Sequence, residues 1–209
     1  MFFTIVLDLE EESLAAYSAE PLLVECSSNP KTPSEIMEAF RKTVDEDAPT
    51  QYFKVCRLND PEEKQADILC NYKNPKTNLR APVKVRFEGE SGVGTGPVRE
   101  FFLEAISLIE NGIGSPRVML FEGEKDHKIP VHNPVMRQTG AYRAAGKILG
   151  HSILHGGPGL FGLSPAIKHY FSFKDLASFP PPLEMDDLSD YLLRQCIEQV
   201  SSQDRGVTL

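Results

Sequence analysis

The chain has 209 residues, of which 41% are hydrophobic and 25% are charged, as in an ordinary globular protein with a sizeable core. Its formal net charge of −8 gives an acidic surface that repels phosphates, so we expect no nucleic-acid partner, and no local basic patch stands out along the sequence. No run of residues reaches the apolar length that a membrane helix requires, so we also expect no membrane partner.

The beginning of the chain does not have the pattern of a secretory signal. Its short apolar run is interrupted by Asp8, and no Lys or Arg precedes Lys31. We therefore expect a cytoplasmic or nuclear location.

The four cysteines do not have the spacing of a redox pair or of a metal site. They are Cys26, Cys56, Cys70 and Cys196. Without a Cys-x-x-Cys pair or a short ligand spacing, we expect reduced thiols that are buried as small apolar groups. The sequence therefore indicates neither a metal nor a cofactor.

Local patterns in residues 1–80 predict several short elements and no identifiable chemistry. In chain order they are a strand at Phe2–Leu9, a loop at Cys26–Pro33, a helix from Pro33 to about Val44, a strand at Gln51–Leu58, a short helix at Lys64–Cys70 and an exposed connection at Asn71–Pro82. The first helix is predicted by the capping box Thr32-Pro33-Ser34-Glu35, and Asp60-Pro61-Glu62-Glu63 has a similar layout. We interpret residues 1–80 as an amino-terminal segment packed on the remainder.

The stretch Val83–Phe102 has the pattern of a strand, a glycine turn and a helix. Val83, Val85 and Phe87 alternate with polar residues, which predicts a half-buried strand. Glycines follow at positions 92, 94 and 96, and Arg99–Ile109 is apolar at helical spacing.

This layout is also the context in which glycine-rich loops hold phosphates, because a helix N-terminus offers unpaired backbone amides. A dinucleotide loop would need glycine at position 97, where Pro97 stands, and a nucleoside-triphosphate loop would need Gly-Lys-Ser/Thr, which is absent. Phosphate binding remains an alternative to a tight connection that needs positive φ at several positions.

The next segment is predicted to be mostly irregular. The helix that includes Arg99–Ile109 is expected to end at Asn111–Pro116, which contains two glycines. Val118–Phe121 then has the pattern of a short strand, and Glu122–Pro134 is a predicted loop. Its histidines, His127 and His132, are expected to be solvated.

A second informative stretch runs from Gly140 to Phe171. Tyr142–Leu154 has helical periodicity, and its many glycines and alanines predict a central helix that packs closely against another backbone. The run Gly156-Gly157-Pro158-Gly159 is expected to end this helix, and Ser164-Pro165 to begin a short one. The face predicted to be available for packing comprises Ala145, Ile148, Leu149, Ser152 and Ile153.

Two catalytic patterns are incomplete in this second stretch. His151 and His155 are spaced as in zinc metalloproteases, but Ser152 stands where that motif has Glu, so we expect packing or capping histidines and no metal. The run His155-Gly156-Gly157-Pro158 is similar to the oxyanion loop of α/β-hydrolases, but no Gly-x-Ser-x-Gly elbow follows it.

A last helix is predicted near the end of the chain. It begins at Asp186 or Asp187, and Ser201–Leu209 is polar and expected to fray. Its apolar face comprises Leu188, Tyr191, Leu192, Cys196 and Val200.

The two informative stretches resemble the amino-terminal lobe of HECT-type ubiquitin ligases. In that family a Phe-x-Gly-Glu strand end meets a glycine turn and a helix that opens Arg-Glu-Phe-Phe. The matching residues here are Phe87, Gly89, Glu90, Gly92, Val93, Gly96, Arg99, Glu100, Phe101 and Phe102, and in the second stretch Gly146, Gly150, His155, Gly156, Ser164, Pro165 and Tyr170. Gly94 departs from the acidic residue usual in the family. The HGGPG and SPA runs are most similar to divergent HECT-like proteins related to the G2/M-phase-specific ubiquitin ligase.

The resemblance covers about Val83 to Ala177, which is 95 of the 209 residues. It implies an α+β fold, mainly helical with a few short strands, in which residues 81–200 form a partial amino-terminal lobe and residues 201–209 a frayed tail. In the family, a subdomain that docks the ubiquitin-conjugating enzyme and a lobe with the catalytic cysteine follow. The 33 residues after Leu176 cannot hold either.

The resemblance therefore implies a protein related to ubiquitin-protein ligases that is inactive as this chain alone. No catalytic residue is transferred, because none of the four cysteines lies in the Thr-Cys-x-Asn-like loop of the family. The alternative is a non-catalytic protein-binding module or a regulatory, truncated HECT-like protein. The expected partners are proteins of the ubiquitin pathway or the missing carboxy-terminal HECT parts.

Overall fold

The computed structural model describes residues 32–56, 60–90, 92, 94–114, 116–172 and 180–204. They divide into two compact units, a larger unit with residues 32–120 and 132–160 and a smaller unit with residues 121–131 and 161–204. The described residues form a mixed fold of helices and short strands, dominated by helices, in agreement with the predicted α+β class. Among them, no helix is both long and apolar enough to span a membrane.

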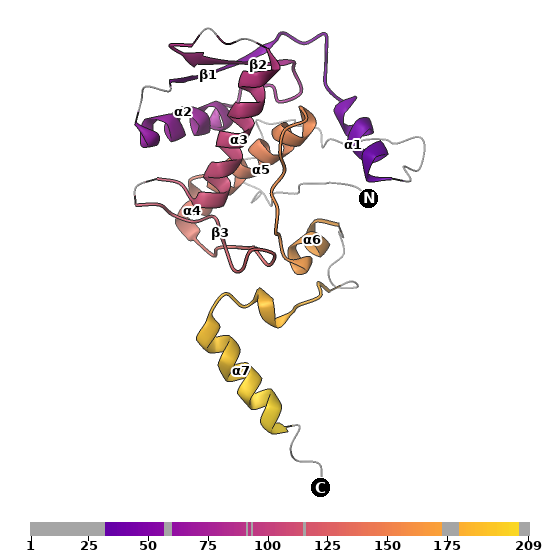
Figure 1. Cartoon of the computed structure of the whole chain (residues 1–209), viewed down its shortest axis with the longest axis vertical. Coiled ribbons are helices and arrows are strands. Elements are labelled where there is room, and N and C mark those ends of the chain that lie inside the picture. The colour runs from indigo at the N-terminus through magenta and orange to yellow at the C-terminus, as the bar shows by residue number, and fades with distance from the viewer. Residues whose placement is uncertain are drawn as a thin grey trace. The chain divides into compact units, whose positions relative to one another are not determined.

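A two-stranded parallel sheet forms one end of the larger unit (Figure 1). Strand β1 (Gln51–Cys56) pairs with β2 (Val83–Glu88) in a register that places Phe53 opposite Val85. Both strands alternate between buried and exposed side chains, because the helices cover one face of the sheet only. The two predicted strands are confirmed, and residues 57–59 at the end of the first lie outside the described residues.

Helix α2 (Pro61–Lys73) connects the two strands and is longer than predicted. The Asp60 carboxylate caps it by accepting hydrogen bonds from the amides of Glu62 and Glu63, both at 2.9 Å. The expectation of an exposed connection at Asn71–Pro82 is wrong at both ends. The helix continues to Lys73 because Tyr72 is buried, and Ala81 is buried where the chain enters β2.

Helices α1 (Pro33–Arg41) and α3 (Thr95–Asn111) confirm two predicted elements with shifted ends. The capping box of α1 forms between Thr32 and Glu35, and the helix ends before Val44. Helix α3 starts four residues before the predicted Arg99, because proline is accommodated in a first turn where amides have no intrahelical partner. Gly94, with a φ of 102°, is its N-cap.

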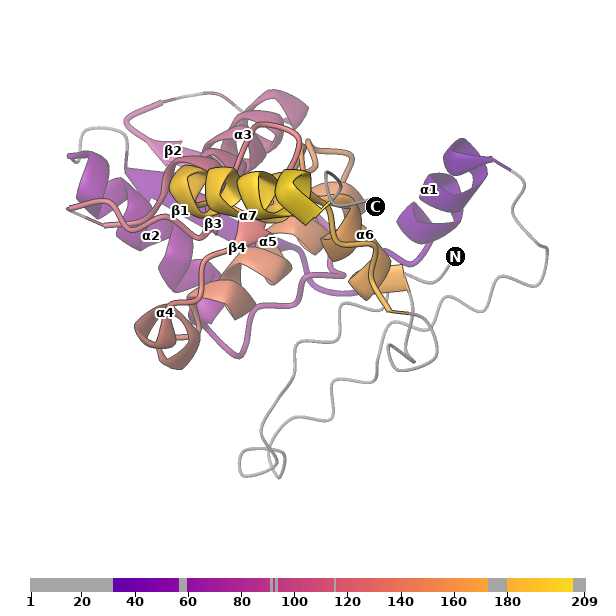
Figure 2. The same cartoon turned by 90° about the horizontal axis from the view of Figure 1, so that it is seen from below.

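Helix α5 (Ala141–Leu154) is the centre of the larger unit, as predicted. It packs against α1, α2 and α3, and against the short helix α4 (Pro134–Gln138) that precedes it. Figures 1 and 2 both place α5 between α1 and α2. Its buried face differs from the prediction, since Leu149 and Ile153 are only half-buried. The residues that are buried instead include Ala141, Ala144, His151 and Leu154.

The predicted strand Val118–Phe121 is only partly confirmed. Val118 forms an isolated antiparallel bridge with Ile113 in the larger unit. In the smaller unit β3 (Phe121–Glu122) pairs with β4 (Ile129–Pro130), so the predicted loop Glu122–Pro134 contains part of a hairpin.

The rest of the smaller unit is helical. Helix α6 (Pro165–Ser172) begins as predicted, and the Ser164 hydroxyl accepts a hydrogen bond from the Ile167 amide at 3.2 Å. At Met185–Asp187 the chain forms only a 3₁₀ turn, η2. Helix α7 (Tyr191–Asp204) begins later than predicted, because the Asp190 carboxylate caps it. It extends to Asp204, residues 205–209 lie outside the described residues, and the frayed tail stays a prediction.

Two sequence predictions concern residues that the structure does not describe. The strand at Phe2–Leu9 lies wholly within residues 1–31, and so does nearly all of the loop at Cys26–Pro33. Both stay predictions.

Candidate functional site

A groove with a volume of about 1470 Å³ crosses the surface of the larger unit and is lined by both of the informative stretches. One wall follows β2 continuously from Pro82 to Arg86 and continues into the glycine turn and the first turn of α3. The other wall is the end of α5 and the loop from His155 to Pro158. Arg41, the last residue of α1, also lines it. The two stretches therefore form one surface feature.

Phe102 of α3 is the point where the two stretches contact each other. Its ring lies edge to face with His151 of α5, with centroids 5.1 Å apart, and stacks on His155 at 6.3 Å. A Cβ atom on Gly157 would lie 3.0 Å from two carbons of Phe102 and 2.5 Å from the Ser152 hydroxyl oxygen. Glycine at position 157 thus allows the loop after α5 to pass directly over Phe102.

Helix α5 is also tied to α2 and to the segment that follows α2. Nδ1 of His151 lies 3.0 Å from the Tyr72 hydroxyl oxygen, and Lys147 Nζ donates to the Tyr72 carbonyl at 3.2 Å. His155 Nε2 donates to the Leu79 carbonyl at 3.2 Å. These contacts and the β1–β2 pairing join residues before position 80 to residues after it. The interpretation of residues 1–80 as an amino-terminal segment stays a prediction.

Burial keeps the two α5 histidines neutral near pH 7. His151 is 1% exposed, and burial, with a smaller contribution from the charge of His155, lowers its pKa to about 3. Burial also lowers the pKa of His155, and it raises that of Tyr72. Both histidines are packing residues, as predicted. Among the described residues no group of three His, Cys, Asp or Glu side chains is placed to hold a metal.

The loop after α5 does not have the free amides of an oxyanion hole. The Gly156 amide donates to the Ile153 carbonyl at 3.2 Å, and the Gly157 amide donates to the Ser152 carbonyl at 2.7 Å. The Ser152 hydroxyl is buried and donates to the Pro158 carbonyl at 2.6 Å. The groups that would stabilise a developing negative charge in a hydrolase are therefore used to close the helix.

The glycine turn reaches the groove at the N-terminus of α3. Gly94 has a φ of 102° and Gly89, directly after β2, has a φ of 85°, but Gly92 and Gly96 do not have positive φ, so the prediction of positive φ holds at one of the three glycines of the turn. Among the described residues, no side chain forms a capping hydrogen bond at this first turn. The Gly-Lys-Ser/Thr run of a nucleoside-triphosphate loop is absent from the sequence, and phosphate binding stays an untested alternative.

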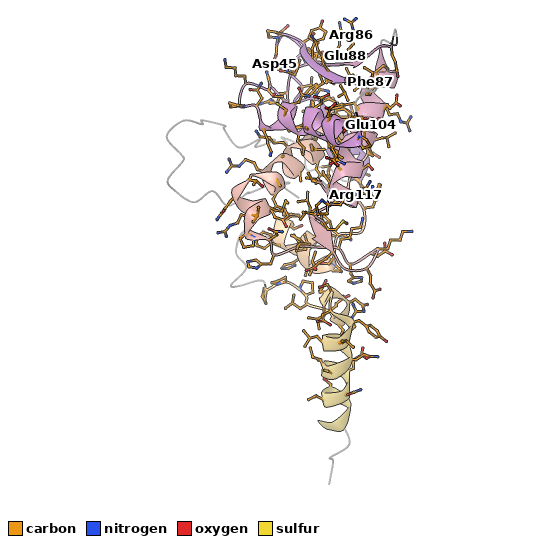
Figure 3. The ribbon with its side chains drawn as sticks, turned by 90° about the vertical axis from the view of Figure 1, so that its left-hand side faces the viewer. Asp45, Arg86, Phe87, Glu88, Glu104 and Arg117 are labelled. Atoms are coloured by element: carbon orange, nitrogen blue, oxygen red, sulfur yellow. The ribbon has the colours of Figure 1, made fainter. Side chains whose placement is uncertain are left out.

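The groove is positively charged in a chain that is negative overall. Five cationic side chains line it, against the carboxylates of Glu46 and Glu90, which gives +3 where the whole chain carries −8. Figure 3 shows Arg86 and Glu88 on the side of β2 opposite to Phe87, which is buried. The cations are Arg41, Lys54, Lys84, Arg86 and Arg99.

The prediction that the chain has no basic patch is therefore wrong. Lys84 and Arg86 lie on the polar side of a predicted strand, but only the parallel pairing of β1 with β2 places Lys54 directly opposite Arg86. The alternation along both strands identified their polar faces. No local signal in the sequence indicates that the two faces adjoin.

The prediction that the cysteines are buried is wrong for those the structure describes. Cys56 is half-buried, Cys70 and Cys196 are exposed, and Cys26 lies outside the described residues. Helix α2 buries Ile68 and Tyr72 on a face that leaves Cys70 outside. Within its own unit, α7 leaves its apolar residues uncovered, and Cys196 with them. No described cysteine lines the groove.

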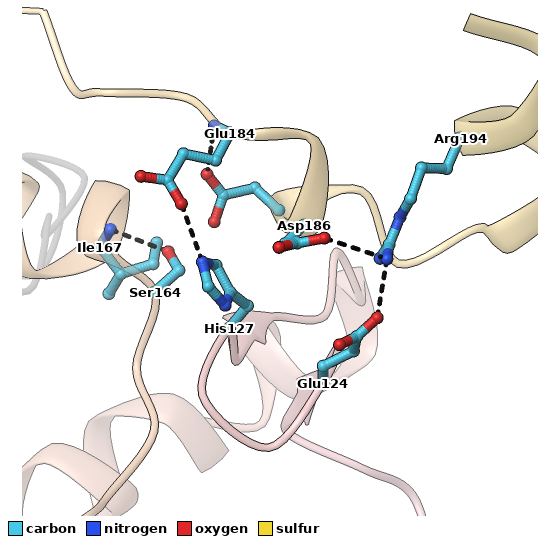
Figure 4. A network of polar contacts seen from close by, with 8 residues as sticks. Glu124, His127, Ser164, Ile167, Glu184, Asp186 and Arg194 are labelled. Carbon is cyan, nitrogen blue, oxygen red and sulfur yellow. Dashed lines mark hydrogen bonds and ion pairs between the residues drawn. The ribbon is translucent and has the colours of Figure 1, made fainter. Parts of the chain in front are cut away.

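The smaller unit contains an exposed polar network that links both of its chain segments (Figure 4). His127 is not simply solvated as predicted, because its Nε2 lies 3.0 Å from the Glu184 carboxylate, and this hydrogen bond raises its pKa. Arg194 Nη1 contacts Glu124 at 2.7 Å and Asp186 at 3.2 Å. His132, in the larger unit, is exposed as predicted.

No protein-family model matches the chain, and no curated protein sequence matches it significantly.

Proposed function

We propose that this chain is a HECT-related protein built on an amino-terminal-lobe scaffold, and that it acts by binding other proteins. The observation that carries the proposal is the packing of its two resembling stretches. Phe102 contacts His151 and His155, and described residues between Glu90 and Phe102 and from Leu154 to Pro158 line one groove. The end of the second stretch, with Ser164, Pro165 and Tyr170, belongs to the smaller unit. Segments that belong to one lobe are expected to pack together in this way.

The second part of the proposal is that the chain has no ligase activity by itself. Transfer of ubiquitin through a thioester needs an accessible thiolate, which a neighbouring positive charge favours. Cys70 and Cys196 are exposed, but no described cysteine lies in the cationic groove or in a Thr-Cys-x-Asn-like loop. A protein-binding role, in which the chain associates with ubiquitin-pathway proteins or competes with full-length relatives, requires no thiol.

A ubiquitin-loading assay tests the absence of activity. The purified chain is incubated with ATP, ubiquitin, ubiquitin-activating enzyme and a panel of ubiquitin-conjugating enzymes, and the products are separated with and without reductant. We expect no reducible ubiquitin adduct on the chain, while a HECT ligase in a parallel reaction forms one. A reducible adduct that disappears in Cys70→Ser or Cys196→Ser would show that the chain is an enzyme.

Co-purification tests the relation to the family. The chain is mixed with the carboxy-terminal HECT parts of a ligase and with an unrelated protein of similar charge. Selective retention of the HECT parts supports the proposal. Equal retention of both, or retention of neither together with no binding of ubiquitin or of any conjugating enzyme, contradicts it.

A further inference from the structure

We propose that the groove binds an acidic segment of a partner protein, in extended conformation, along the free edge of β2. The inference names a class of partner for the protein-binding role proposed above and rests on that role. Three observations carry it. One edge of β2 has no strand paired to it among the described residues, and the cations beside that edge form no ion pair with a described carboxylate. The chain outside the groove is negatively charged.

Strand β2 offers one edge to a further strand. The sheet has only two strands in the described part of the chain, so β1 occupies one edge of β2. Among the described residues, no backbone hydrogen bond uses the amides and carbonyls of Val83 and Val85 on the other edge, and this edge ends at Phe87, whose carbonyl accepts from the Glu90 amide at 3.2 Å. The groove follows β2 from Pro82 to Arg86, residue after residue. A peptide in extended conformation is the ligand that satisfies such a row of amides and carbonyls.

Three cations beside this edge lie close together and form no ion pair with a described carboxylate. Lys54 and Arg86 are direct neighbours across the sheet, and like charges in that relation destabilise a strand pair. Lys84 lies over the Tyr52 ring, with Nζ 5.9 Å from the ring centroid. Within the described residues none of the three forms an ion pair with a carboxylate. Carboxylates on a bound peptide would relieve this repulsion.

The charge of the rest of the chain favours a short acidic peptide over a nucleic acid. Outside the groove the chain is more negative than its total of −8, so a long polyanion that extends past the groove is repelled. Apolar side chains of Val98 and Leu103 also line the groove. They suit the alternate apolar side chains of a peptide strand and offer nothing to a phosphate backbone.

Fluorescence anisotropy with the full chain tests this assignment. The probe is a labelled peptide of alternating Glu and Val residues, and the matched probe has Lys in place of Glu. We expect the acidic peptide to bind at least about tenfold more weakly to Lys84→Glu/Arg86→Glu than to the unaltered chain, and more weakly at high salt. The control, Lys73→Glu/Lys76→Glu, makes the same charge change on exposed residues outside the groove and should alter binding less than about twofold.

Hydrogen exchange of the unaltered chain gives a second measurement that does not depend on the folding of a variant. Amides of β2 should exchange more slowly when the acidic peptide is bound, because the peptide pairs with that edge. No binding of the acidic peptide, equal binding of the Lys peptide, an equal effect of the control variant, or unchanged exchange in β2 would each overturn the proposal.

Two other occupants are distinguished in the same assay. A single-stranded oligonucleotide of equal charge that binds as tightly as the peptide would assign the groove to nucleic acid. The chain's own acidic residues near position 10 are neutralised in Glu10→Gln/Glu11→Gln/Glu12→Gln, and a rise in peptide affinity of about tenfold would assign the groove to that segment. Peptide binding together with a ubiquitin thioester on the chain would overturn the proposed absence of activity and leave this inference intact.

Discussion

The hydroxyl oxygen of Tyr72 lies 3.0 Å from Nδ1 of His151, although the two residues are 79 positions apart in the chain. Both side chains are 1% exposed. Their rings meet edge to face, and the ring of Phe53 lies against each of them, at centroid distances of 5.8 Å from Tyr72 and 5.3 Å from His151. This buried hydrogen bond joins α2 to α5 beneath the sheet and behind the groove.

Tyr72→Phe should therefore destabilise the larger unit. The substitution keeps the ring and removes only the hydroxyl, which leaves Nδ1 of His151 buried without its partner, at a cost of about 1–3 kcal/mol in the free energy of unfolding. Thermal unfolding followed by circular dichroism measures the effect. Tyr52→Phe removes a hydroxyl from a side chain that is 57% exposed and should leave the unfolding temperature unchanged. Equal unfolding temperatures for both variants would contradict the importance of this hydrogen bond.

Acid should destabilise the fold as the pH falls below about 6.5. Burial lowers the pKa of His151 from 6.5 to about 3, so between these values the unfolded chain binds a proton that the folded chain does not. The stability contributed by neutral His151 is complete above pH 6.5 and is lost toward pH 3, by about 1.4 kcal/mol for each pH unit. His155, whose pKa is also lowered by burial, adds to the loss in the same direction.

Nuclear magnetic resonance of the histidine rings checks this directly. We expect the His151 ring signals to keep their neutral-state positions between about pH 7 and pH 5. The unfolding temperature should fall over the same interval. A His151 ring that titrates near its ordinary pKa would show that it is not buried as described.

Gly157→Ala should be destabilising although the φ of Gly157 is not in the left-handed region. The added methyl group would overlap the Ser152 hydroxyl at 2.5 Å and press on Phe102 at 3.0 Å, which costs about 1–3 kcal/mol by overpacking. Gly159→Ala is the matched control, because nothing lies within 4 Å of a Cβ atom at that position. Chemical unfolding of the two variants should separate them, and comparable stabilities would mean that the loop does not pass this close to α3.

Arg194→Ala should loosen the first turns of α7 within the smaller unit. Besides its contacts with Glu124 and Asp186, Arg194 donates through Nη2 to the Leu188 carbonyl at 2.7 Å, and its side chain is only 13% exposed. We expect lower local stability and faster amide exchange in α7 and in residues 121–131. Lys168→Ala, on the exposed side of α6, should change neither. Unaltered exchange after Arg194→Ala would show that the network does not order this helix.

Local signals in the sequence predicted elements wherever a few neighbouring residues decide the backbone. The capping box at Thr32 and Glu35, the alternation from Val83 to Glu88 and the glycine run after Leu154 each act over less than about ten residues. The corresponding helix starts, strand and helix end are all found in the structure. Some element ends moved because burial extended a helix, as at Tyr72, or because a neighbouring cap displaced its start, as at Asp190.

The tertiary structure decided which of these side chains meet. No pattern within either segment specifies that Lys54 lies opposite Arg86, that Phe102 touches His151, or that the glycine turn and the loop after α5 line one groove. These relationships depend on strand register and helix packing, which are set by the summed burial of apolar side chains from distant segments. The sequence by itself determined the elements and the residues that resemble a HECT lobe, and only packing made a cationic groove of them.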